Sequence, residues 1–452
     1  MKRKTPIISA IALSVAAVFG APSQVAAADG DSTLQFYGHF DLSFDVMSKG
    51  LKEGGSGGNP APVGYTGVQP QISSNLSYLG FRGDHDIGGG SRLVFQAETQ
   101  MDVSATPGPS PVNQASQGNV DNKVQGALVS RNSFLGIASG WGAVKLGKTD
   151  APYKLSTSRM DPFSATIGDY NSIMGNTGGD NRAEFDTRLS HAVWYESPKM
   201  GGVSFSALWA PGQNIASDNS NNASGEPNCT GGGGGQGSGI GAGVNIGPCN
   251  DGSFGDAFSV AGVYEMGGLY AILAYEYHDK TNRAGDDPVN VGVADEAAGK
   301  VGVQYKFSST TVNAIYEKLT RRNPNPDFNE RQRQGWWLAA TQKFSDADEA
   351  SIGWAHAGKT PGQPGGGAPG QVIATPGPVD NSSNMYTLMY KHHWDKRANW
   401  YAVYAMQKNG PGGHFDLGSS GHGLTTDCKD AAGNCFTGET LQGVSVGLQY
   451  SF

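Results

Sequence analysis

The sequence predicts an all-β protein, a transmembrane antiparallel β-barrel of about 16 strands with short periplasmic turns and long external loops. Two observations carry this prediction. Segments of about ten residues alternate between apolar and polar side chains, and the connections between them alternate between short and long. The alternative, a soluble β-sandwich, usually has strands of about 5 to 6 residues. Beyond its N-terminal segment, the chain contains no apolar run of the roughly 20 residues that a membrane-spanning helix needs.

The alternation is clearest in the segment LQFYGHFDLSFD, which begins at Leu34. A strand places successive side chains on opposite faces, so one face of this segment is apolar and the other is mostly polar. The same pattern returns in VGVQYKF from Val301, in YTLMYKHHW from Tyr386 and in the final LQGVSVGLQYSF from Leu441. We expect the final segment to be anchored in the sheet, because free termini fray.

The connections support the same fold. Seven short and eight long connections join sixteen strands, and the even number places both termini on the periplasmic side. The short connections carry the sequences DIGGG, SGW, PKMGG, MGG, SST, SDAD and DKRA. The long connections lie near residues 47–72, 103–126, 150–183, 211–255, 280–296, 321–333, 359–382 and 409–439. Aromatic side chains gather beside the short turns, as they do at membrane interfaces; they are Phe307, Phe344, Trp394, Trp400, Tyr450 and Phe452.

The N-terminus has the three parts of a secretory signal peptide. The basic residues KRK at positions 2–4 precede a short apolar run, and the small residues of VAAAD follow it. We expect a cleaved signal at residues 1–28, with cleavage after Ala28 or, as the neighbouring alternative, after Ala27, and a single barrel domain at residues 29–452. The alternative, a transmembrane anchor, would need a longer apolar run. Cleavage changes the formal charge from −8 to −11, and binding to nucleic acid is not expected without a basic patch.

The stretch GAVKLGKT, from Gly142 to Thr149, matches the phosphate-binding pattern G-x-x-x-x-G-K-[ST]. A P-loop has a strand that ends before the glycines and a helix that starts at the Lys-Thr pair. Here Val144 and Leu146 alternate with small or polar residues, which predicts that the motif itself is a strand. Pro152 and turn-prone residues follow instead of a helical pattern, so an ATPase is not expected.

Four segments resemble the general trimeric porins of the Gram-negative outer membrane: SYLGFRGDHDIGGGSRLVFQAE, SFLGIASGWGAVKLGK, RLSHAVWYESPKMGGVSFSA and the final GLQYSF. With FYGHFDLSFD and the signal segment, the resemblance spans nearly the whole chain. It implies a homotrimer of barrels in outer-membrane lipid, each passing small hydrophilic solutes and ions without a cofactor. It also implies that the third long loop, residues 150–183, folds into the lumen and narrows the pore.

The resemblance also implies which wall residues line this constriction. The matching positions are His39, Tyr78, Arg131 and Arg188. The two arginines have the type expected of the family, whereas Tyr78 stands where well-known members have an arginine and His39 where they have a lysine. Parity agrees independently, because all four residues lie on the polar faces of their segments. An arginine that faced lipid at mid-depth would cost about 2 to 4 kcal/mol.

The acids that oppose this wall are expected on the infolded loop. The best candidates are Asp161 and Asp169, with Asp180 and Asp186 at the return of the loop. The alternative is that these acids cap turns or pair with neighbouring arginines. A narrow aqueous channel with low-dielectric walls focuses field lines, so its charge balance sets the ion preference. With a charge of −11 and a weakened basic wall, we expect a modest preference for cations.

Two other functions stay open. A substrate-specific channel would carry a ladder of like charges or aromatic side chains along the lumen, and the inward residues Tyr270, Glu276 and His278 are too mixed to form one. An outer-membrane enzyme would need a catalytic motif, and we expect neither a G-x-S-x-G serine elbow nor an H-E-x-x-H metal motif. His191 lies on the apolar face of its segment, which favours an interface or trimer contact over catalysis.

Four cysteines in an exported chain suggest two disulfides. Cys229 and Cys249 lie in the loop at residues 211–255, and Cys428 and Cys435 lie in the last long loop. Of the three possible connectivities, pairing within each loop is the simplest. Loop closure would then contribute up to about 3 kcal/mol for the first pair and about 2.5 kcal/mol for the second. No histidine lies at ligand spacing from either pair, so a metal site is not expected.

Overall fold

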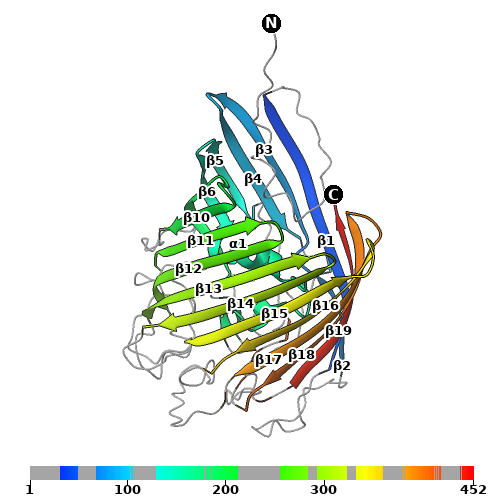
Figure 1. The fold of residues 1–452 in the computed structure, drawn as a ribbon. Helices are drawn as coiled ribbons and strands as arrows, with labels where there is room; N and C mark the ends of the chain where they lie inside the picture. The colour runs from blue at the N-terminus through cyan, green and yellow to red at the C-terminus, as the bar shows by residue number, and fades with distance from the viewer. Residues whose placement is uncertain are drawn as a thin grey trace.

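The computed structural model describes residues 31–48, 68–101, 103–104, 129–177, 180–183, 185–211, 255–282, 293–322, 332–359, 380, 382–411, 413, 415, 417–418, 438 and 440–452. These residues form the closed antiparallel barrel that the sequence predicts (Figure 1). The expected signal peptide and all four cysteines lie outside the described residues. No helix in the described part of the chain is long and apolar enough to cross a membrane.

Seventeen strand segments make sixteen transmembrane strands, because one strand is interrupted. β2 (Val68–Ser74) and β3 (Tyr78–Gly88) are the two halves of that strand, and Leu76 between them has a φ of +53°. The other strands of the barrel are β1 (Ser32–Ser48), β4 (Ser91–Gln100), β5 (Ser133–Ser139), β6 (Gly142–Asp150), β9 (Arg188–Glu196), β10 (Val203–Ala210), β11 (Ala257–Met266), β12 (Leu269–Asn282), β13 (Val293–Phe307), β14 (Thr310–Arg321), β15 (Arg333–Lys343), β16 (Asp348–Ala357), β17 (Ser383–His393), β18 (Ala398–Asn409) and β19 (Thr440–Ser451).

The barrel closes through β1, which pairs with β19 on one side and with β2 and β3 on the other. In the register of β1 with β19, Phe44 lies opposite Val446. Gly38 and Phe452 exchange backbone hydrogen bonds of 3.2 and 3.1 Å, so the final segment is anchored as expected. Closure is required because lipid offers no hydrogen-bond partner to the edge of an open sheet.

The two faces of the strands differ as the alternation predicts. Leu146, Leu273 and Leu448 are at least 56% exposed on the outside of the barrel, where lipid would cover them. Beside the short turns, Phe344 and Trp394 are also exposed, at the level expected for an interfacial aromatic belt. The seven short turns lie where the sequence places them, and each joins two neighbouring strands.

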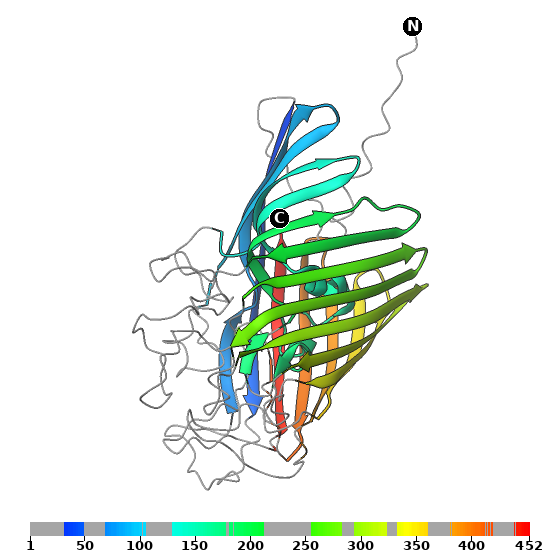
Figure 2. The same ribbon diagram turned by 90° about the vertical axis from the view of Figure 1, so that its left-hand side faces the viewer.

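The apolar core lies inside the barrel, between the wall and the loop that follows β6. Met160, Phe163 and Ile167 of this loop belong to one buried cluster with inward-facing residues of β12 and β14–β19. Figure 2 shows the short helices of the loop within the barrel. Because the outer surface faces lipid, the inside of the barrel is the place where apolar burial drives packing.

Gly447 of β19 offers a test of this inner packing. A Cβ at position 447 would lie 2.2 Å from the ring of Tyr401. Tyr401 is fully buried, and its hydroxyl donates a 3.0 Å hydrogen bond to Asp41 Oδ1. We expect Gly447→Val to displace this ring and to lower the temperature at which the barrel unfolds, measured by its heat-dependent gel mobility. Gly262→Val is the control, because nothing lies within 4 Å of a Cβ there; an equal loss in both variants would contradict the explanation.

Candidate functional site

The third long loop lies between β6 and β9 and extends to residue 187, beyond the predicted end at residue 183. It contains α1 (Pro152–Thr157), the 3-10 turns η2 (Ser158–Met160) and η3 (Tyr170–Ser172), and the short strands β7 (Asn176–Thr177) and β8 (Asp180–Ala183). The expectation that no helix follows Pro152 was wrong, because proline suits the first turn of a helix. The P-loop pattern itself lies within β6, so it is extended as predicted.

The loop is held against the wall by an apolar contact centred on Trp337 of β15. The ring of Trp337 is fully buried and lies 5.8 Å from the ring of Phe163 and 5.3 Å from that of Tyr170. The Trp337 indole N–H donates a 3.2 Å hydrogen bond to the backbone oxygen of Met160. These contacts, with others to β11 and β17, lay the loop against one side of the inner wall.

Two distant points of the loop meet one carboxylate, that of Glu317 on β14. Near the start of the loop, the Tyr153 hydroxyl donates to Glu317 Oε2 at 2.7 Å. Further along the loop, just before β7, the Gly175 N–H donates to Glu317 Oε1 at 2.9 Å. Arg333 on β15 also donates from Nη2 to the Ile173 backbone oxygen at 2.9 Å. Glu317 is 1% exposed, so water cannot readily replace it as the acceptor.

The carboxyl groups of Asp161 and Asp169 are used within the loop. Asp161 Oδ1 accepts a 2.9 Å hydrogen bond from the Phe163 N–H, and Asp161 Oδ2 is buried. Asp169 is buried and accepts 2.9 Å hydrogen bonds from the N–H groups of Ala165 and Asn171. Burial, together with the neighbouring Asp169 carboxylate, raises the pKa of Asp161 well above its ordinary range. This geometry favours turn capping for these acids, and their role in the constriction stays a prediction.

Asp186, at the return of the loop, pairs with Lys300 of β13, and both side chains are almost fully buried. Burial raises the pKa of Asp186 to about 6, although the Lys300 ammonium group acts in the opposite direction. Lys300 Nζ also donates to Thr157 Oγ1 at 2.9 Å, which ties the start of the loop to the same strand. Asp180 begins β8, and its side chain lies outside the described part of the structure.

Three of the four predicted wall residues lie together. His39 Nδ1 on β1 is 2.8 Å from Ser451 Oγ, and the His39 ring lies 5.7 Å from that of Tyr78 on β3. The guanidinium of Arg131, in the turn before β5, lies 4.8 Å from the centre of the Tyr78 ring, a cation–π distance. Arg131 Nε also pairs with Glu98 Oε1 of β4 at 2.5 Å.

The fourth wall residue, Arg188, lies in a second cluster at the start of β9. Its Nη2 is 3.1 Å from Asp150 Oδ1, and its Nε donates to Asn132 Oδ1 at 2.8 Å. Lys154 of α1 reaches the same Asp150 oxygen at 3.0 Å. Asp150 therefore joins the barrel wall to the first turn of the infolded loop.

The sequence did not predict the partners Glu98, Asp150 and Glu317. For Glu98 a signal was available, because it shares the polar face of its strand with Gln96 and Gln100. For Glu317 there was none, since its partners lie more than 140 residues away along the chain. The paired charges nearly cancel at long range, but within a narrow channel they still orient water and dipolar solutes.

The described residues contain neither a metal cluster nor a serine elbow of the kind that catalysis would need. Among the described residues, no group of three or more His, Cys, Asp or Glu side chains could hold a metal ion. The pattern G-x-S-x-G occurs at residues 54–58, outside the described residues, and from Gly443 to Gly447. A catalytic serine elbow needs a sharp turn from a strand into a helix. The second pattern lies wholly within β19, and its Ser445 is fully buried.

The double role of Glu317 generates a prediction. In Glu317→Gln, the amide can accept one of the two hydrogen bonds, but its NH2 group faces the other donor, so a buried donor loses its acceptor at a cost of about 1 to 3 kcal/mol. We expect noisier open-channel current in planar-bilayer recordings and faster proteolysis within the loop. Glu349→Gln, near the periplasmic rim, is the matched control; identical current noise in both variants would show that Glu317 does not hold the loop.

The sequence has relatives among characterised proteins. It is 29% identical over 150 residues to the major outer membrane protein P.IA of Neisseria meningitidis, which is 33% of this chain and 32% of that protein. It is 28% identical over 144 residues to the major outer membrane protein P.IB of the same species, which is 32% of this chain and 36% of that protein. The chain therefore matches about a third of the length of these relatives.

Solved structures share the fold over nearly the whole chain. The anion-selective porin from Comamonas acidovorans superposes with a TM-score of 0.60 at 19% identity, covering 93% of this chain and all of that one. Salmonella typhi OmpF, solved in complex with daunomycin, gives a TM-score of 0.56 at 15% identity, covering 93% of this chain and 98% of that one. At these identities the likeness establishes the fold alone.

The family described as Gram-negative porin matches residues 12–412, well over half of the chain. The match agrees with the closed barrel, the infolded third loop and the outer-membrane relatives. This protein therefore belongs to the Gram-negative porin family and is a multi-pass protein of the outer membrane.

Proposed function

We propose that the protein forms a water-filled channel for the passive diffusion of small hydrophilic solutes and ions, and we assign it no catalytic activity. The observation that carries this proposal is the third loop, which is fixed to one side of the inner wall by Trp337 and Glu317. The charged residues Arg131, in the turn before β5, and Arg188, at the start of β9, lie elsewhere on the same wall. Ordered water and charges in such a passage disfavour apolar solutes, and its width limits solute size.

Purified, folded protein should raise the conductance of a planar bilayer in discrete steps. Liposomes that contain it should swell in sugar solutions at rates that fall as the sugar becomes larger, because the infolded loop narrows the passage. Heat-denatured protein is the control for both measurements. A folded sample that gives neither steps nor swelling would refute the proposal.

The proposal also covers the oligomeric state, the signal peptide and the disulfides. A homotrimer is supported by the family. One neighbour with 12% identity and a TM-score of 0.53 is described as the trimer form of Vibrio cholerae OmpT. Residues 1–28 are proposed as a signal peptide removed during export. The proposed disulfides are Cys229–Cys249 and Cys428–Cys435, which non-reducing peptide mapping would detect.

We also propose a modest preference for cations, which rests on the net charge of −11 without the signal segment and on His39 and Tyr78, which stand where well-known members of the family have basic residues. The local geometry limits the strength of this cation preference. Asp169 is buried within the loop, and Glu98 and Asp150 on the wall each lie beside a base. The name of the Comamonas protein states the opposite selectivity, at 19% identity. We therefore propose that any negative field in this channel comes from the wall acids Glu98 and Asp150 and not from the loop.

If the wall acids supply the negative field, substitutions at the wall should change the zero-current potential across a KCl gradient. Glu98→Gln should move selectivity towards anions and Arg131→Gln towards cations, because each leaves its partner's charge uncompensated. Both shifts should shrink at high salt, since the Debye length falls from about 10 Å at 0.1 M to about 3 Å at 1 M. Asp169→Asn should leave the potential unchanged. A larger shift from Asp169→Asn than from Glu98→Gln would place the charged constriction on the loop instead.

A second candidate function, a substrate-specific channel, is favoured by one observation. Arg82 lies over the ring of Tyr37 at 4.8 Å, and Arg131 lies over the ring of Tyr78 at the same distance. Two stacked Arg–Tyr pairs along β1, β3 and the turn before β5 would suit a planar or anionic solute. Saturable block of the ionic current by one class of solute would support this function over general diffusion.

A further inference from the structure

Two described residues of the last external loop lie inside the barrel, as the third loop does. Phe415 and Leu417 lie between β18 and β19 in the chain, and their side chains are 1% and 0% exposed. Both belong to the same buried cluster as Ile167 and Met174 of the third loop and Met385 of β17. An external loop that stayed in water would expose such side chains. We call Pro411, Gly413, Phe415, Leu417 and Gly418 the entrance strap.

Hydrogen bonds hold the strap at the external ends of the strands. Asn409, the last residue of β18, donates from Nδ2 to the Phe415 backbone oxygen at 2.9 Å. The Gly413 N–H donates to the Gly410 oxygen at 2.8 Å, and the Gly438 N–H donates to the Gly413 oxygen at 2.9 Å. The strap is therefore bonded both to the strand that precedes it and to the segment that returns to β19.

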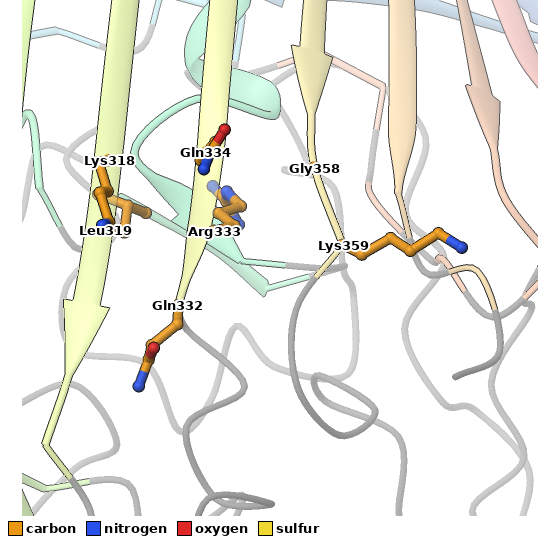
Figure 3. A pocket seen from close by; sticks show the side chains of 7 residues that line it. All are labelled: Lys318, Leu319, Gln332, Arg333, Gln334, Gly358 and Lys359. Atoms are coloured by element: carbon orange, nitrogen blue, oxygen red, sulfur yellow. The ribbon is translucent and has the colours of Figure 1, made fainter. Parts of the chain in front are cut away.

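Arg333 connects the strap with the third loop. Its guanidinium lies 5.2 Å from the centre of the Phe415 ring, and its Nη2 donates to the Ile173 oxygen at 2.9 Å. Figure 3 shows Arg333 beside the third loop, while Gln332 points away from it. A hollow of about 280 Å³ at the external ends of β14–β16 borders Arg333. One arginine thus contacts both infolded segments at the external end of the barrel.

We propose that the entrance strap is a second size-determining element of the channel. Phe415 and Leu417 fill space on the inner side of the external entrance. Arg333 contacts both Phe415 and the third loop, so it links the two segments. Larger solutes must therefore pass two successive restrictions, the strap first when they enter from outside. This inference rests on the proposed channel function but concerns different residues from those that line the predicted constriction.

The test is the double substitution Phe415→Ala with Leu417→Ala. We expect a larger unit conductance and faster liposome swelling with larger sugars, because the variant removes two side chains from the entrance. The matched control is Phe258→Ala with Leu388→Ala, which removes the same side chains from the lipid-facing surface. The control should keep the wild-type conductance and the wild-type limit on sugar size.

Polymer access measured from each side of the membrane distinguishes a wider external entrance from a general loosening of the barrel. A polyethylene glycol too large for the wild-type entrance should enter and reduce the current of the double variant when added on the external side. Addition on the periplasmic side should change little. Heat-dependent gel mobility will show that the variant is folded; if it is not, Asn409→Ala, which removes one hydrogen bond to the strap, replaces it in both measurements.

The outcomes distinguish this inference from the proposed function. Wild-type protein without conductance steps would refute the channel itself. Wild-type steps with unchanged conductance, sugar limit and polymer access in the folded variant would overturn the role of the strap and leave the channel intact. Increased access from the periplasmic side alone would also overturn it, because the restriction would then lie elsewhere.

Discussion

The requirement that every backbone N–H and C=O in lipid be hydrogen-bonded determines the rest of this structure. β1 meets this requirement by pairing with β19 and with both halves of the interrupted second strand, so the sheet has no edge. Closure also fixes which side chains face lipid, because successive residues point to opposite faces. Most of the large apolar residues are thereby outside, whereas the inner face carries small and polar residues together with the apolar residues that pack against the infolded segments.

Because the outer face contacts only lipid, specific side-chain packing takes place in the lumen. Lipid covers the outer face without any precise fit, whereas the infolded segments must match the inner wall. Phe163 and Tyr170 of the third loop pack against Trp337, and Phe415 and Leu417 pack inside the external end of the barrel. The third loop and the entrance strap share one apolar cluster, so close packing positions both segments inside the barrel.

Burial also decides what the charged residues can do. Glu317, Lys300 and Asp186 are almost fully buried, and their hydrogen bonds and ion pair hold the third loop rather than face solutes. Arg131 and Arg188 each lie beside a carboxylate on the wall. The paired charges can orient water across a channel, whereas the net charge of the chain is spread over the whole molecule. Acid content alone therefore says little about the field at the narrowest point.

The alternation of side chains is a local property that lipid on one side makes unambiguous. It is therefore sufficient to predict the barrel, its sixteen strands, its seven short turns and the inward direction of Tyr270, Glu276 and His278. The course of the loops, by contrast, depends on tertiary contacts. The helix after Pro152, the entry of Phe415 and the shared use of Glu317 depend on contacts between segments far apart in the chain. No local sequence pattern predicts such contacts, because the conformation of an infolded loop depends on the residues of the inner wall against which it packs.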